Sequence, residues 1–237
     1  MSRGDFDVDS LARYLHVTPD QVVRMAERGN VPARRLGGQW RFSEAEIHHW
    51  LEQRIGAANE ADLVKVENVL HRRPLAEESQ FGSVAELLPA EAIAIPLPAR
   101  TKNSVILAMV DLAVQTGILW DKEKMVDAVK AREDLHPTAL DNGVALLHPR
   151  RPLAQILAQP LLALGITPHG LPFGESNGQL TDVFFLICST DDAQHLRILA
   201  RLSRLIASDG FLTELRNAPD RYSVLEIISR YEDKLSL

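Results

Sequence analysis

The spacing of hydrophobic and polar positions changes twice along the chain. A compact, arginine-rich stretch comes first, a polar segment of mixed charge follows, and apolar runs then alternate with amphipathic stretches. These changes predict a small N-terminal domain over residues 1–55, a helical connector over 56–80 and a larger domain over 81–237.

Four apolar runs in the larger domain predict β-strands, around 92–97 and over 143–148, 160–166 and 182–190. Continuous apolar runs are typical of strands covered on both faces. Amphipathic patterns predict helices around 105–113 and over 121–134, 190–208, 208–218 and 221–235. We expect Ser189 or Thr190 to cap the third of these helices. Strands interleaved with helices predict an α/β/α layered domain with a central mixed sheet.

The N-terminal domain has the pattern of a winged helix-turn-helix. A short amphipathic helix over 9–15 precedes a second one, for which Thr18 is a good N-cap and Gly29 an end signal. The short connection between them is typical of a helix-turn-helix. Gly37 and Gly38 then predict the tip of a β-hairpin. Ser43 begins a third predicted helix, in which Glu46 completes a capping box.

The net charge of -6 gives the whole chain no attraction for nucleic acid, so DNA contacts require a local basic patch. Such a patch is formed by Arg24, Arg28, Arg34, Arg35 and Arg41, opposed within the same stretch by Glu27 alone. Arginines of this kind hold phosphates, while Thr18, Gln21 and Arg24 would reach base edges. The alternative interpretation is a solvated basic face. We expect Trp40 to pack in the core.

The connector carries apolar residues at helical spacing, namely Leu63, Val66, Val69 and Leu70. Because one small module binds DNA weakly, a homodimer that reads two half-sites is one interpretation of this helix. The other is a helix that packs on one of the two domains.

Cys188 is the only cysteine, so the chain has no internal disulfide and no cysteine-based zinc site. The N-terminus lacks the pattern of a signal peptide, and no apolar run is long enough to span a membrane. We therefore expect a cytoplasmic protein with no membrane insertion, no metal and no bound cofactor.

Two stretches resemble known families. Residues 11–51 read LARYLHVTPDQVVRMAERGNVPARRLGGQWRFSEAEIHHWL and resemble the excisionase and MerR-like helix-turn-helix family. The resemblance implies that the second helix enters the major groove. It also implies that the wing, with Arg34, Arg35 and Arg41, lies along the DNA backbone.

The larger domain resembles the fructose/mannitol-type IIA domain of the bacterial phosphotransferase system and its nitrogen-regulatory relatives. The segments that carry the resemblance are ARTKNSVILAMVDLA, AREDLHPTALDNGVALLHPR and GQLTDVFFLICSTDDAQHLRILARLSRLIASDGFLTELRNA. The resemblance implies that His148 accepts a phosphoryl group from HPr or a nitrogen-type paralogue, beside His195, Arg132 and Thr138. A covalent phosphohistidine is then expected in place of a cofactor. The family has proline immediately before its active histidine, where this chain has Leu147.

Elementary chemistry favours the same histidine. A neutral imidazole is a good nucleophile near pH 7, and phosphoryl transfer needs mainly positioning and donors for charged oxygens. Arg132 and Arg150 would supply such donors, and His195 would donate an N–H or fix the ring of His148. We expect the strand end to present His148 at the sheet edge, within reach of a protein donor.

Three functions follow. The first is a regulator in which phosphorylation of His148 is coupled to DNA binding. The second is a IIA component that passes its phosphoryl group to a IIB sugar-transport protein. The third is a non-enzymatic DNA-binding or protein-binding adaptor with a degenerate site.

Overall fold

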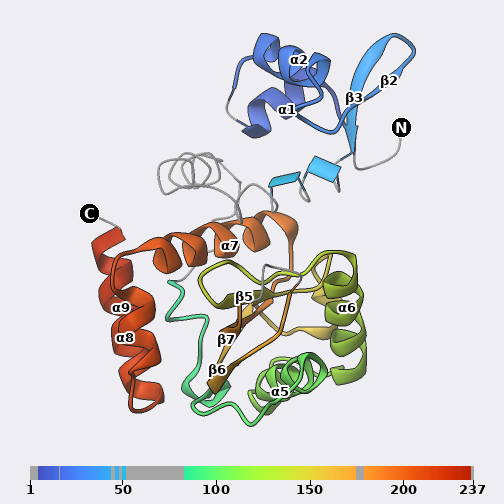
Figure 1. Cartoon of the computed structure of the whole chain (residues 1–237). Helices are drawn as coiled ribbons and strands as arrows, with labels where there is room; N and C mark the ends of the chain where they lie inside the picture. The colour runs from blue at the N-terminus through green and yellow to red at the C-terminus, as the bar shows by residue number, and fades with distance from the viewer. Residues whose placement is uncertain are drawn as a thin grey trace. The chain divides into compact units, whose positions relative to one another are not determined.

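The structure is a computed structural model that describes residues 5–15, 17–43, 46–47, 50–51, 83–174 and 179–235. The chain divides into two compact units, Met1–Glu78 and Ser79–Leu237 (Figure 1). The predicted connector helix and its apolar stripe lie outside the described residues, as does part of the predicted third helix of the N-terminal domain.

The N-terminal unit is a helix-turn-helix with a wing. Its elements are β1 (Asp5–Phe6), α1 (Val8–Leu15), α2 (Pro19–Glu27), β2 (Arg34–Leu36) and β3 (Gln39–Ser43). The three strands form an antiparallel sheet in the order β1-β3-β2. Leu11, Val22, Phe42 and Ile47 are fully buried and form the centre of this small core.

Local signals set the boundaries of these elements. Thr18 caps α2 as predicted, with Pro19 in the first turn. Gly37 and Gly38 form the hairpin tip between β2 and β3, and both have the positive φ that such turns require. Trp40 is only half-buried, so the expectation that it packs in the core is wrong. Phe42, two residues along β3 and on the same face of the strand, is fully buried, whereas Trp40 lies nearer the exposed hairpin tip.

The larger unit is a layered α/β domain. Its strands are β4 (Ile93–Ala94), β5 (Val144–Leu147), β6 (Leu161–Leu171) and β7 (Thr181–Cys188); its α-helices are α5 (Lys102–Gln115), α6 (Lys122–Leu135), α7 (Asp192–Ala207), α8 (Phe211–Arg216) and α9 (Arg221–Leu235). Short 3-10 turns, η1 (Ala90–Ala92) and η2 (Ala154–Ile156), precede β4 and β6. The sheet order is β4-β6-β7-β5, with β6 and β7 antiparallel and the two outer pairs parallel. The predicted mixed sheet is confirmed.

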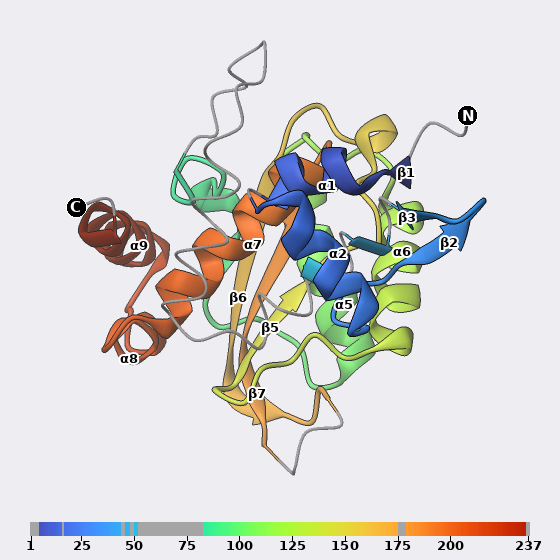
Figure 2. The same ribbon diagram turned by 90° about the horizontal axis from the view of Figure 1, so that it is seen from above.

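Helices cover both faces of the sheet, as predicted. Figure 2 shows α5 and α6 on one side of the strands and α7, α8 and α9 on the other. Ala145 and Leu147 of β5 belong to the core under α5 and α6, together with Phe184 and Leu186 of β7. Since side chains alternate across a strand, the intervening positions face α7. His148 and Ser189, each one residue beyond the end of its strand, lie on this same side of the sheet, toward α7.

Two predicted boundaries differ. The first strand is only Ile93–Ala94: Ala92 belongs to the 3-10 turn η1, and the chain bends at Ile95 and at Pro96, which has no amide hydrogen to donate. The cap of α7 is Asp191 and not Ser189 or Thr190, since the Asp191 carboxylate accepts the Gln194 amide at 2.8 Å. Within the described ranges, no helix combines the length and the apolar character needed to cross a bilayer.

Candidate functional site

The candidate phosphoryl site lies where two neighbouring strands end. β5 and β7 run parallel, with Leu147 opposite Leu186. Their carboxyl ends therefore meet at one edge of the sheet, which is a common place for functional groups in α/β proteins. His148 directly follows β5, and Ser189 directly follows β7.

The structure brings the rings of His148 and His195 together at this edge. Their centroids are 4.9 Å apart and their planes are inclined by 53°. His195 enters from the first turn of α7, where its amide donates to the Asp191 carbonyl at 3.0 Å. Both residues are only 3% exposed. The expectation that the strand end leaves His148 open to a donor protein is therefore wrong for this conformation, because His148 faces the α7 layer.

One backbone contact fixes the tautomer of His148. Its Nδ1 lies 2.7 Å from the carbonyl oxygen of Leu146. A carbonyl only accepts hydrogen bonds, so Nδ1 must carry the proton. In the neutral ring the lone pair then lies on Nε2, which is the nucleophilic nitrogen.

The ring of His195 is held by a serine. Oγ of Ser189 lies 3.0 Å from Nδ1 of His195, and Ser189 is fully buried. Sequence reasoning assigned Ser189 only to helix capping. The available signal was a hydroxyl residue directly after a buried strand and six residues before the histidine in the first turn of the next helix.

Arg132 and Thr138 surround the segment that leads into β5. Arg132 is buried near the end of α6, and its Nη1 donates to the carbonyl of His136 at 2.7 Å. The carbonyl of Thr138 accepts from the amide of Leu146 at 3.3 Å, so Thr138 borders the strand that ends at His148. The hydroxyl of Thr138 donates to the carboxylate of Glu133. Arg150 is exposed, beyond the buried Pro149.

Glu133 is a buried carboxylate that sequence reasoning missed. It is 1% exposed, accepts the amide of Thr138 at 3.2 Å, and has Nζ of Lys102 at 3.5 Å from its Oε2. Burial raises the pKa of this carboxyl, and the hydrogen bond from Thr138 and the charge of Lys102 partly offset that effect. An acidic residue in an amphipathic helix normally faces water, so the sequence pattern did not predict that Glu133 is buried.

Helix α2 of the N-terminal unit and its N-cap present the predicted polar residues on the exposed side. Thr18 and Gln21 cap each other: the Thr18 hydroxyl accepts the Gln21 amide, and Gln21 Oε1 accepts the Thr18 amide at 2.8 Å. Arg24 is exposed one turn further on, with Nε donating to the Asp20 carbonyl at 3.2 Å.

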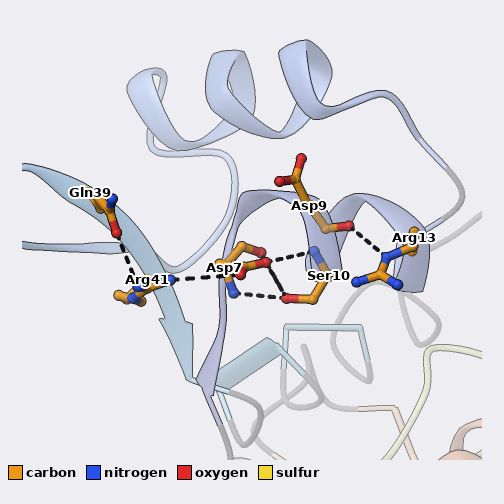
Figure 3. Close-up of polar contacts among 6 residues, drawn as sticks. All are labelled: Asp7, Asp9, Ser10, Arg13, Gln39 and Arg41. Atoms are coloured by element: carbon orange, nitrogen blue, oxygen red, sulfur yellow. Dashed lines mark hydrogen bonds and ion pairs between the residues drawn. The ribbon is translucent and has the colours of Figure 1, made fainter. Parts of the chain in front are cut away.

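The arginines of the wing have acidic partners from the start of the chain. Arg34 pairs with Asp5 at 2.6 Å. Arg41 lies 4.0 Å from Asp7 and donates to Gln39 at 3.1 Å (Figure 3). Within residues 24–41 Glu27 is the only acidic residue, as predicted. The two aspartates come from outside that stretch: Asp5 lies in β1, which pairs with β3, and Asp7 follows directly after β1. Such exposed pairs contribute about 0–1 kcal/mol, so phosphates can replace them.

Arg35 is placed differently from the other two wing arginines. Its guanidinium lies 4.5 Å from the centroid of the Trp40 ring, directly across the hairpin. Stacking on an aromatic face orients the guanidinium without neutralising its charge. Arg35 is therefore a pre-oriented cation on the wing.

The fold and its paired histidines define a IIA-like α/β/α domain joined to a winged helix-turn-helix. Solved structures agree on the fold. The nitrogen regulatory protein IIA-Ntr of Neisseria meningitidis aligns with a TM-score of 0.55 and 20% identity, covering 61% of this chain and 98% of that one. The mannitol IIA of Escherichia coli gives 0.52 and 22%, covering 59% and 97%.

Curated relatives match the same part of the chain. The fructose-specific EIIABC component of Bacillus subtilis is 27% identical over 151 residues, which are 63% of this chain but 23% of that longer protein. The nitrogen regulatory protein of Bradyrhizobium diazoefficiens is 27% identical, covering 62% of this chain and 94% of its own length.

Family models complete the comparison. Residues 86–231 match the model described as "Phosphoenolpyruvate-dependent sugar phosphotransferase system, EIIA 2", and residues 6–55 match a helix-turn-helix domain. The chain belongs to the EIIA type 2 family and carries a helix-turn-helix domain at its N-terminal side. Both resemblances seen in the sequence are confirmed.

Proposed function

We propose that this protein accepts a phosphoryl group on Nε2 of His148 and that this modification regulates DNA binding by its helix-turn-helix domain. The observation that carries the proposal is the pair of imidazoles at the strand ends, with Nδ1 of His148 bound to the Leu146 carbonyl. The donor is a phosphohistidine on HPr or on a nitrogen-type paralogue.

The transfer balances without any added reagent. The lone pair on Nε2 of His148 attacks phosphorus as the N–P bond of the donor breaks, and that electron pair stays on the donor ring. The donor ring, protonated on its other nitrogen, leaves as neutral imidazole, and its positive charge passes to the phosphorylated ring of His148, which keeps its proton on Nδ1. No proton has to leave Nε2, because the ring proton is on Nδ1. Positioning and charge stabilisation supply the catalysis, as in other phosphoryl transfers. His195, whose ring lies beside that of His148, is proposed to donate to the phosphoryl oxygens, and Arg132 and Arg150 are proposed to supply guanidinium donors.

Access is part of the proposal. His148 and His195 are 3% exposed, so docking of the donor must open the site before Nε2 is reached. Closure afterwards would exclude water and slow hydrolysis of the phosphohistidine.

The regulatory step rests on charge. A phosphoryl group adds negative charge and three acceptor oxygens, which change the contacts that the larger domain can make. The exposed cations of the N-terminal unit, Arg24, Arg34, Arg35 and Arg41, are proposed to hold duplex DNA, with Thr18 and Gln21 toward the bases. The proposal includes a homodimer, in which two such modules bind two half-sites.

Two assays test these steps. Incubation with phosphoenolpyruvate, enzyme I and HPr should give acid-labile phosphate on the wild type and none on His148→Ala. Duplex binding, measured across a salt series with and without phosphorylation, should then differ between the two forms. Equal binding by both forms would contradict the proposed regulation of DNA binding, but not the acceptance of phosphate by His148.

A second candidate is transfer onward to a IIB sugar-transport protein. It is favoured by the similarity to a fructose-specific EIIA component of Haloferax volcanii, 24% identical, of which this chain covers 94%. Phosphate passing from the loaded protein to an isolated fructose-type IIB protein would support it. A chain that takes no phosphate in either assay would be an adaptor with a degenerate site.

A further inference from the structure

Ser189 has no role in the reaction described so far, yet it makes a direct contact with one of the two imidazoles. Its Oγ is 3.0 Å from Nδ1 of His195, and no part of the residue is exposed. A buried hydroxyl normally has a hydrogen-bonding partner, and here that partner is a ring nitrogen at the candidate site.

Other bonds already hold the backbone of this turn. The Asp191 carboxylate accepts the Gln194 amide at 2.8 Å. Oε1 of Gln194 in return accepts from the hydroxyl of Thr190 at 3.1 Å. These contacts begin α7 and place the backbone of His195. The bond from Ser189 acts on the His195 ring itself.

We propose that Ser189 is a positioning residue: its hydroxyl donates to Nδ1 of His195 and keeps the proton of the neutral ring on Nε2. The inference rests on the proposed phosphorylation of His148. Because Nδ1 of His195 faces Ser189, the nitrogen left for a phosphoryl group is Nε2. Phosphoryl oxygens only accept hydrogen bonds, so Nε2 must carry the proton to stabilise them.

The two rings then have complementary tautomers. His148 carries its proton on Nδ1, held by the Leu146 carbonyl, and presents a lone pair on Nε2. His195 accepts from Ser189 on Nδ1 and presents an N–H on Nε2. A nucleophile and a donor therefore lie 4.9 Å apart, measured between ring centroids, before any phosphate arrives. Such preorganisation lowers the cost of reaching the transition state.

Nitrogen-15 NMR of the histidine rings tests this tautomer directly, on the unphosphorylated full-length protein at a pH where the rings are neutral. The signals of His195 are identified by their loss in His195→Gln. The wild type and Ser189→Thr should show the proton on Nε2, while Ser189→Ala should show a mixture of tautomers. A wild-type ring with its proton on Nδ1 would overturn the proposal, and that result needs no variant to fold.

Phosphotransfer supplies the second readout. Ser189→Ala should accept phosphate on His148 roughly tenfold more slowly than the wild type, with Ser189→Thr restoring most of the rate. The matched control is Ser203→Ala, which removes another buried hydroxyl from the α7 layer. An unchanged rate in Ser189→Ala, or an equal loss in Ser203→Ala, would contradict a specific role for Ser189. If the wild type takes no phosphate, the proposed function fails, while the ring tautomer still decides the role of Ser189.

Discussion

The ring of His148 lies 4.9 Å from the ring of His195, centroid to centroid, although one follows a β-strand and the other belongs to a helix. β5 and β7 set this distance, because they are parallel neighbours and α7 begins just after β7. The other two histidines described in the larger unit, His136 and His169, are exposed.

The first prediction concerns His195. His195→Ala, which leaves no side-chain donor, should still accept phosphate on His148, but about ten- to a hundredfold more slowly, because one hydrogen bond to a charged group contributes about 1.5–3 kcal/mol. The rate of phosphate incorporation measures this. His169→Ala should keep the wild-type rate, and a His195→Ala rate equal to it would argue against a role for the second imidazole.

The second prediction concerns the hydroxyl of Thr138. Thr138→Val removes a donor from the buried carboxylate of Glu133 and should destabilise the protein by about 1–3 kcal/mol in urea unfolding. Thr138→Ser keeps the hydroxyl and should lose much less. Because Val keeps the methyl group and Ser keeps the hydroxyl, equal losses in the two variants would contradict a dominant contribution from the hydrogen bond.

The third prediction is a pH dependence from Glu133. Burial raises the pKa of its carboxyl above the ordinary 4.5, so the folded state binds more protons than the unfolded state between these two values. Stability from this group is therefore full at low pH and falls as pH rises from about 4.5 through the raised pKa.

Urea unfolding across a pH series measures that effect. Glu133→Gln removes the titration, so the free energy of unfolding of the variant minus that of the wild type should increase as pH rises through this window. A constant difference between the two proteins at every pH would show that Glu133 does not titrate there.

The fourth prediction concerns the wing. Asp5→Asn releases Arg34 from its ion pair and should tighten duplex binding by up to about fivefold, since exposed pairs contribute about 0–1 kcal/mol. Arg35→Ala should weaken binding and lower the salt slope by about one counterion. Filter binding at several salt concentrations measures both. Weaker binding by Asp5→Asn would mean that the pair orders the wing for DNA and does not compete with it.

The elements of this fold were largely predictable because long apolar runs and helical stripes leave few alternatives. The three strands 143–148, 160–166 and 182–190 correspond to β5, β6 and β7, with shifted ends. The cap of α7 was less predictable, since Ser189, Thr190 and Asp191 are adjacent and all suit the position.

Other features depend on contacts that no local pattern records. Glu133 is buried because its carboxylate meets Thr138 and Lys102, which come from different segments. Asp5 reaches Arg34 through the β1-β3-β2 sheet. The burial of His148 is likewise a property of the assembled layers. Sequence reasoning therefore indicated which residues gather at the strand ends, but not how enclosed they are.

The nitrogen that carries the phosphoryl group tests the central claim most directly. Full-length protein labelled with nitrogen-15 on histidine, phosphorylated by phosphoenolpyruvate, enzyme I and HPr, can be read by phosphorus–nitrogen coupling in NMR. The account predicts phosphorus on Nε2 of His148, with the proton retained on Nδ1 beside the Leu146 carbonyl. Phosphorus on Nδ1 of His148, on another residue, or nowhere in the chain would contradict it.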